Sequence, residues 1–212
     1  MNATELRNLF RAEMSDAVEP YLISDDQVYR YLDDAQKQFC RWTEGIEDGR
    51  TFTLAIAPNV QWYNTDKSIL KLRRVVNTVT GKLVTVVNPE KLEDFGIRFD
   101  SRVGPVRALV AGLSKNQLRA WPIPNIAATL ALEVFRLPVT LVAGAQPEID
   151  EQHHINLLIW AKHRAYGNED TEVFNSRRAA EYEARFRTYC AESRIDQERS
   201  RRVTGTVTYG GI

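Results

Sequence analysis

The chain has 212 residues, of which 43% are hydrophobic and 26% charged, and its 28 basic residues equal its 28 acidic residues. This length and composition are typical of one packed domain, or of a domain with a modest insertion. The zero net charge argues against a dedicated nucleic-acid binder, which normally carries an overall basic excess.

Cysteine usage and the N-terminus favour a soluble protein made inside the cell. Cys40 and Cys190 are far apart and match no zinc or redox spacing, so we expect two reduced thiols. The start "MNATELRNLF" lacks the basic and then apolar run of a signal peptide. No apolar stretch approaches the roughly 20 residues of a membrane span.

The first 50 residues predict two helices. Apolar residues recur at helical spacing in the first segment, with Asn2 or Thr4 as a possible cap: Leu6, Leu9, Phe10, Met14 and Val18. "SDDQ" is a capping box, in which Ser24 caps a second helix and Gln27 reaches back to it. The buried stripe of this second helix is Val28, Leu32, Ala35, Phe39, Trp42 and Ile46.

From residue 51 the hydrophobic period changes to that of strands. "TFTLAI" alternates, "SILKLRRVVNTV" and "LVTVV" form a hairpin around "TGK", and "NPEKLEDFG" reads as a short helix between Asn88 and Gly96. "VRALVA", "QLRAWP" and "TLALEVFRL" add strands, with Leu130, Leu132 and Val134 on one face of the last. Trp121, beside two prolines, is interpreted as closing an edge strand rather than as a binding platform.

Two helices follow the strands. The first is expected at about 148–166, with Ile155, Leu158, Ile159 and Ala165 as its apolar stripe and Gly167 as its end. The last runs from about Asp170 to Arg199, and its core residues are Ala179, Tyr182, Phe186 and Tyr189. Its acidic-to-basic pairs at four-residue spacing are Glu181 with Arg185, Glu183 with Arg187 and Glu198 with Arg202.

Together these elements predict an α+β fold. A helical bundle domain is built from residues 1–50 and 139–199, a mostly antiparallel β domain is inserted over 51–138, and an extended tail covers 200–212. The stripe from Val28 to Ile46 should pack against both C-terminal helices.

No constellation of residues predicts catalysis, and we expect no cofactor, nucleotide or metal. "EQHHI" places His153 and His154 side by side, but neighbouring residues point about 100° apart on a helix and no further ligand completes a metal site. They are interpreted as polar residues of a helix's first turn. Phosphate-binding glycine loops and serine nucleophile elbows are both missing from the sequence.

The end of the chain, "RSRRVTGTVTYGGI", is rich in strand-forming residues rather than those of solvated tails. Termini are usually disordered, yet an extended segment of this kind can add to the edge of another chain's sheet. The candidate binding residues are Arg199, Arg201, Arg202, Val203, Thr204, Gly205, Thr206, Val207, Thr208 and Tyr209.

In order and spacing, three stretches resemble the head-to-tail adaptor (connector) proteins of tailed, mainly short-tailed, bacteriophages. They are "LRNLFRAEMSDAVEPYLISDDQVYRYLDDAQKQFCR", "LRAWPIPNIAATLALEVFRLP", and "PEIDEQHHINLLIWAKHRAYGNEDTEV" running on to "RRAAEYEARF". Residues 51–105 match only loosely.

The resemblance implies a structural virion protein that is not an enzyme. It would form a homo-oligomeric ring, usually of twelve copies, beneath the portal protein and carry the tail nozzle or tail tube. Packaged DNA would pass through the channel without sequence-specific contact, and the C-terminal tail would engage the portal. Such a protein is found in the host cytoplasm during assembly and then at the head-to-tail interface of the virion.

Two alternatives belong to other classes. The arginine-rich final helix and tail could serve a nucleic-acid-binding regulator, although neutral net charge and paired glutamates weaken this reading. An enzyme with a site hidden from sequence ranks last.

Overall fold

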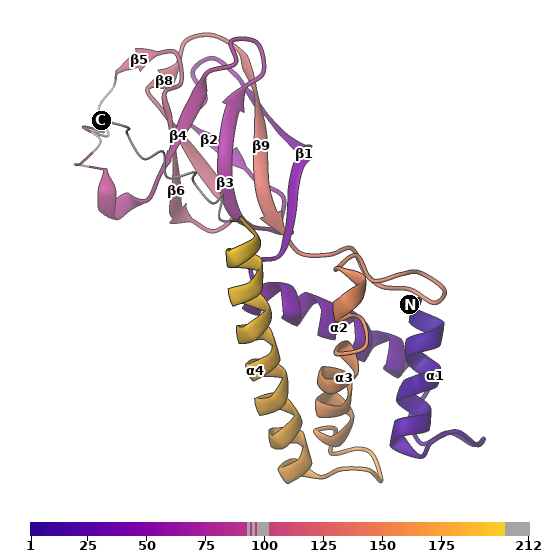
Figure 1. Ribbon diagram of the computed structural model, residues 1–212. Helices are drawn as coiled ribbons and strands as arrows, with labels where there is room; N and C mark the ends of the chain where they lie inside the picture. Colours follow the sequence, from indigo (N-terminus) through magenta and orange to yellow (C-terminus); the bar gives the residue numbers. More distant parts are fainter. Residues whose placement is uncertain (93, 95, 97–101, 202–212) are drawn as a thin grey trace, which may run out of the picture. The chain divides into compact units, whose positions relative to one another are not determined.

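The computed structural model describes residues 1–92, 94, 96 and 102–201 (Figure 1). It consists of two compact units: a helical unit, Met1–Glu44 with Pro138–Ile212, and a β unit, Gly45–Leu137. Over these described residues the fold is α+β, with four α-helices and a mostly antiparallel, curled sheet (Figure 1).

Helix α1 (Ala3–Met14) is shorter than its apolar pattern predicts. Asn2 caps it in a reciprocal box with Glu5, and Ser15 ends it in the left-handed conformation with φ 57°. Val18, which we expected on the buried face, therefore lies beyond the helix and is 81% exposed. The sequence pattern continued by chance past the point where Ser15 turns the backbone.

Helix α2 (Asp25–Trp42) begins at the predicted capping box of Ser24 and Gln27. Its end differs from the prediction, because Ile46 is the first residue of a strand rather than the last of the helical stripe. Gly45 makes this change of direction with φ +83°, and a Cβ there would lie 2.7 Å from the carbonyl oxygen of Arg136. Only glycine fits such a backbone without strain.

The helix predicted at 148–166 is divided in the structure. A 3-10 turn, η2 (Glu151–His153), precedes α3 (Leu157–Tyr166), which ends at Gly167 as expected. Ile155 lies between the two and is 52% exposed, so its assignment to the buried stripe was wrong. Trp160 is buried, and its indole Nε1 donates to Asp34 Oδ2 at 2.8 Å.

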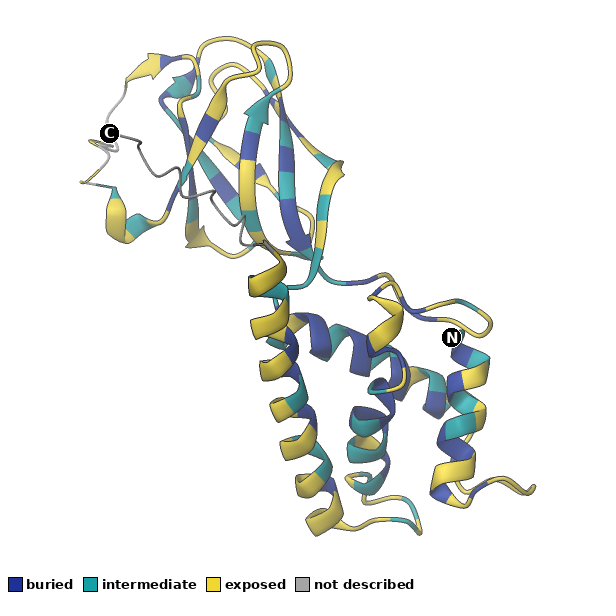
Figure 2. Ribbon diagram, viewed as in Figure 1, coloured by how far each residue is buried: buried dark blue, intermediate teal, exposed yellow. Residues whose placement is uncertain are grey.

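Helix α4 (Ser176–Arg201) starts six residues later than predicted and continues through Ser200 and Arg201. Asn175 accepts a hydrogen bond from the Arg178 N–H at 3.0 Å, which satisfies one free donor of the first turn. Figure 2 shows a long exposed side on α4. Ala179 and Phe186 are buried, whereas Tyr182 and Tyr189 are half-buried.

The core of the helical unit lies where α3 contacts α1, α2 and α4. Leu32 and Phe39 of α2 are both buried, as predicted. Aromatic rings fill much of this core: Phe39 with His153 and Tyr189, and Trp42 with Trp160 and Phe186. Cys40 and Cys190 are buried free thiols, and burial raises the pKa of Cys190 to about 12.

The β unit is built on a seven-stranded sheet in the order β1-β9-β3-β4-β6-β7-β2, with a separate pair β5-β8. All pairings in the larger sheet are antiparallel except that of β4 with β6. The strands are β1 (Ile46–Ile56), β2 (Trp62–Asn64), β3 (Ile69–Asn77), β4 (Leu83–Val87), β5 (Val103–Gly104), β6 (Ala108–Ser114), β7 (Gln117–Trp121), β8 (Ile123–Pro124) and β9 (Ala128–Arg136).

The sheet curls around a large apolar core (Figure 2), beside which Val87 and Ala108 form a smaller cluster. Leu130, Leu132 and Val134 of β9 are buried in it, which confirms the predicted face of the last strand. The predicted hairpin is β3 with β4, where Val75 faces Val84.

Two local predictions in the β unit were right only in part. Where we expected a short helix, the described residues form a 3-10 helix, η1 (Pro89–Lys91), with Asn88 at its N-cap and Pro89 as its first residue, but the Asn88 side chain makes no cap hydrogen bond. Trp121 does not sit on an edge strand, because β7 lies between β6 and β2. Its half-buried ring packs instead on a small cluster formed by Val87 and Ala108.

Candidate interaction surfaces

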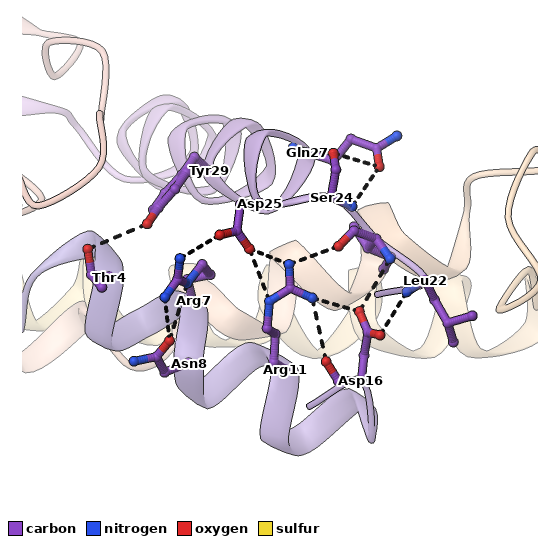
Figure 3. A network of polar contacts seen from close by, with 11 residues as sticks. Thr4, Arg7, Asn8, Arg11, Asp16, Leu22, Ser24, Asp25, Gln27 and Tyr29 are labelled. Atoms are coloured by element: carbon purple, nitrogen blue, oxygen red, sulfur yellow. Dashed lines mark hydrogen bonds and ion pairs between the residues drawn. The ribbon is translucent and has the colours of Figure 1, made fainter. Parts of the chain in front are cut away.

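The loop between α1 and α2 is held by a buried arginine that the sequence does not reveal. Arg11 is 5% exposed and Asp16 is 4% exposed. The Arg11 Nη1 donates to Asp16 Oδ2 at 2.9 Å, and Nη2 donates to the carbonyl oxygen of Ile23 at 2.9 Å (Figure 3). One guanidinium thus joins both ends of the loop to α1.

The carboxylates complete this network (Figure 3). Asp16 Oδ1 accepts the Leu22 N–H at 2.8 Å, and Asp25 receives hydrogen bonds from Arg11 and from Arg7. The hydrogen bond from Arg11 and the charges of both arginines lower the pKa of Asp25, although partial burial opposes them. Buried charges that are paired and hydrogen-bonded in this way fix one loop conformation.

The fixed loop displays apolar side chains to solvent. Val18, Tyr21 and Leu22 are all exposed, and we refer to these three residues as the loop patch. The Arg11 guanidinium carbon lies 3.6 Å from the centre of the Tyr21 ring, a cation–π contact that holds the ring in place. These three residues are therefore a candidate contact surface.

The candidate tail residues lie only partly within the described chain. Arg199 is exposed on α4, where its Nη1 donates to Asp196 Oδ1 at 3.3 Å. Arg201 is the last residue of α4, and its side chain lies outside the described part. The other eight, Arg202, Val203, Thr204, Gly205, Thr206, Val207, Thr208 and Tyr209, lie wholly outside it.

Three arginines of α4 form ion pairs with glutamates one turn away. Glu183 pairs with Arg187 at 2.7 Å, as expected. Glu181 pairs instead with Arg177, which precedes it, at 3.1 Å. Glu198 pairs with Arg194 at 3.1 Å, and its predicted partner Arg202 lies outside the described residues. Most charges on this face are therefore matched locally.

The two adjacent histidines are buried, and they lie at the end of η2 rather than in the first turn of α3, which begins at Leu157. His153 Nδ1 lies 2.6 Å from the Tyr189 hydroxyl, and burial lowers the pKa of His153. His154 Nε2 donates to the carbonyl oxygen of Ile149 at 2.9 Å. Across the described residues, no group of three or more His, Cys, Asp or Glu side chains is arranged to hold a metal ion.

A family model described as SU10 adaptor protein matches residues 1–209. The chain belongs to this family. No curated protein matches the chain.

Membership in the SU10 adaptor family supports a phage adaptor-type protein and a component of the virion. It also suggests a structural role rather than an enzymatic one. The match spans both units and most of the sequence that follows Arg201. Within the described chain, no helix combines the length and apolar character needed to cross a membrane.

The sequence analysis did not predict the buried Arg11–Asp16 pair or the loop patch. A signal was present, because Ser15 and Asp16 stand directly after the last apolar residue of α1 and are residues that favour turns. The apolar pattern, which continued to Val18, outweighed that signal in our reading.

Proposed function

We propose that this chain is the subunit of a ring, usually of twelve copies, that joins the portal of a phage head to the tail nozzle or tail tube. The observation that carries the proposal is the match of the SU10 adaptor model to residues 1–209. The order of weak motifs along the chain supports a head-to-tail position, and DNA would pass through the ring without base-specific contact.

Neighbouring subunits would contact each other through two different surfaces, because a closed ring needs both on each copy. The loop patch suits one of these surfaces, because Arg11 already holds the loop backbone and contacts the Tyr21 ring, so that less conformational freedom is lost on binding. Matched charges along α4 suit polar contacts that add specificity rather than affinity.

The C-terminal segment would bind the portal as an extended chain. Strand-forming residues after Arg202 supply backbone groups that can pair with a sheet edge, and the arginines before them suit acidic groups on the portal. Proline at Thr206 or Val207 should weaken this contact if that N–H is paired, because proline lacks the donor. Single threonine-to-serine changes in this segment should have a mild effect.

The test is native mass spectrometry and negative-stain imaging of the chain alone and with the portal protein of its phage. We expect mostly monomer alone, a closed ring with portal, and weaker ring formation at high salt. Rings that form at low concentration without portal and ignore salt would contradict this assembly order. A protein that stays monomeric with portal and shifts DNA would contradict the adaptor proposal itself.

A second variant tests the tail separately. A chain that stops at Arg201 keeps every residue of α4 that the structure describes. It should fold as the full chain does and bind portal more weakly. Unchanged affinity for portal would show that the segment from residue 202 onward is not the docking element.

A further inference from the structure

The sheet of the β unit divides beside strand β3. β3 pairs with β9 from Ile69 to Asn77, but it pairs with β4 only at Val75 and Val76. From Thr85 onward β4 pairs with β6 instead. Among the described residues, the first half of β3 therefore has a strand neighbour on one side only.

A hollow of about 570 Å³ occupies this division. One wall is formed by β3 residues 69–73, and the other by residues 111–118 of the β6–β7 hairpin. Leu72, Val86 and Leu118 give it partly or fully buried apolar lining. The hollow thus combines the edge of a strand with an apolar floor, and an extended peptide needs both to add to a sheet.

The charged groups lining the hollow are basic. They are Lys71, Arg73 and Lys115, and its described lining includes no acidic side chain. Arg73 forms an ion pair with Glu47, and the Lys71 Nζ lies 5.7 Å from the centre of the Phe135 ring, so neither is isolated. The local charge still favours a negatively charged occupant.

We propose that this hollow binds an extended, acidic segment of a partner protein other than this chain, which adds to β3 as a further strand. Five residues of β3 form the wall, so a segment of about five residues, roughly 17 Å long, would run along it. Backbone hydrogen bonds to β3 would hold the segment. Its carboxylates would lie near Lys71 and Lys115.

Two other occupants fit less well. The strand-forming C-terminal segment of this chain follows Arg199, Arg201 and Arg202, which Lys71, Arg73 and Lys115 would repel. Single-stranded nucleic acid usually stacks its bases on aromatic side chains, and the described lining of the hollow has none. The proposal stands on the β unit alone and does not depend on the adaptor role.

The experiment uses the full chain and four probes. The main probe is a seven-residue peptide of alternating glutamate and threonine with blocked ends. The others are its lysine counterpart, the glutamate peptide with alternate backbone nitrogens methylated, and oligothymidylate of similar length. Amide hydrogen exchange locates binding, and fluorescence anisotropy measures affinity.

We expect the glutamate peptide to bind and to slow exchange of amides in residues 69–73. The lysine peptide should not bind, and methylation should abolish binding because it removes the donors that pair with β3. Lys115→Glu should weaken binding at least about threefold. Lys82→Glu is the matched control, since Lys82 is an exposed lysine on the β3–β4 turn outside the lining, and should change nothing.

Several outcomes would overturn the proposal. Equal binding of both peptides, or unchanged binding after methylation, would rule out strand addition guided by charge. Binding of oligothymidylate without the peptide would assign the hollow to nucleic acid. Failure of the glutamate peptide to bind at millimolar concentration, or protection of amides elsewhere only, would also refute it.

Discussion

The loop after α1 and the sheet of the β unit are each held in one conformation, but by opposite means. In the loop, a buried guanidinium and a buried carboxylate satisfy each other and four backbone groups at the two ends of the loop. In the sheet, apolar side chains such as Leu130 and Val75 are removed from water, and strand pairing satisfies the backbone.

The two regions differ in how a substitution destabilises them. An apolar core loses stability in proportion to the volume removed, and its neighbours relax into part of the space. A buried ion pair tolerates removal of both partners far better than removal of one, because a single remaining charge stays desolvated. Four experiments follow from this contrast, and the effects expected decrease from the first to the last.

The largest effect is expected for Arg11→Met. It leaves Asp16 buried without its ionic partner, so the free energy of unfolding should fall by about 3–5 kcal/mol. Urea titration followed by circular dichroism at 222 nm reports on the helices. Arg7→Met is the control, because Asp25 keeps its bond to Arg11, and the expected loss is below about 1 kcal/mol.

The double variant Arg11→Met with Asp16→Leu sharpens this result. It removes both charges and should recover part of the lost stability. Recovery should be incomplete, because Asp16 also accepts the N–H groups of Leu22 and Ile23. A double variant less stable than Arg11→Met would mean that those loop hydrogen bonds outweigh the cost of a lone buried carboxylate.

Leu130→Ala probes the opposite kind of region. The side chain is fully buried in the core of the β unit, and its truncation should cost about 2–5 kcal/mol by leaving a cavity. Leu32→Ala should cost a similar amount in the helical unit. Chemical denaturation of each variant gives the loss. Thr129→Ala, on the exposed face of the same strand as Leu130, should stay within about 0.5 kcal/mol.

Asp48→Asn tests an ionic group inside the β unit. Burial alone would raise the pKa of Asp48, but N–H groups of Thr51 and Arg50 and the Arg136 guanidinium prevail and hold it well below its usual value of 3.8. The folded carboxyl group therefore binds a proton less readily than the unfolded one. Its stabilisation is complete above the unfolded pKa and is lost as the pH falls toward the folded pKa.

We expect Asp48→Asn to lower the free energy of unfolding by about 1–3 kcal/mol at pH 7. The difference in free energy of unfolding between the variant and the parent protein should stay constant down to about pH 5 and become smaller in stronger acid. Denaturation at a series of pH values measures it, and Glu90→Gln, an exposed carboxylate on η1, serves as control. A gap that stays constant down to pH 2 would mean that the carboxylate's charge is not the source of the stability.

The same contrast explains which parts of the structure could be predicted from sequence. Leu130, Leu132 and Val134 alternate, and Val28, Leu32 and Phe39 recur at helical spacing, because burial of a regular element imposes its period on the sequence. The Arg11–Asp16 pair imposes no period. Its two residues come into contact only because Ser15 turns the chain. In the sequence, a buried Arg and Asp cannot be distinguished from two exposed charged residues.

Element ends were also hard to predict, because they depend on single backbone conformations. Ser15 and Gly45 adopt positive φ, and the apolar residues that follow, Val18 and Ile46, still fit the helical pattern. The pairing of β4 with β6, which opens the hollow beside β3, depends on contacts between distant residues. Hydrophobic periodicity within one strand carries no information about such partners.

The smallest effect on stability, and the most informative one for function, is expected for Val18→Ser. Val18 is 81% exposed and takes no part in the ionic network that holds the loop. The free energy of unfolding should therefore change by less than about 0.5 kcal/mol. If the loop patch is a contact between neighbouring subunits, the same substitution should weaken ring formation with portal. Val79→Ser is matched closely, because Val79 is 85% exposed on the β3–β4 turn. Native mass spectrometry of both variants with portal tests this prediction. Weaker ring formation for Val18→Ser alone would support the loop patch as an interface. Equal ring formation by both variants would show that the loop held by the ionic network does not contact a neighbouring subunit.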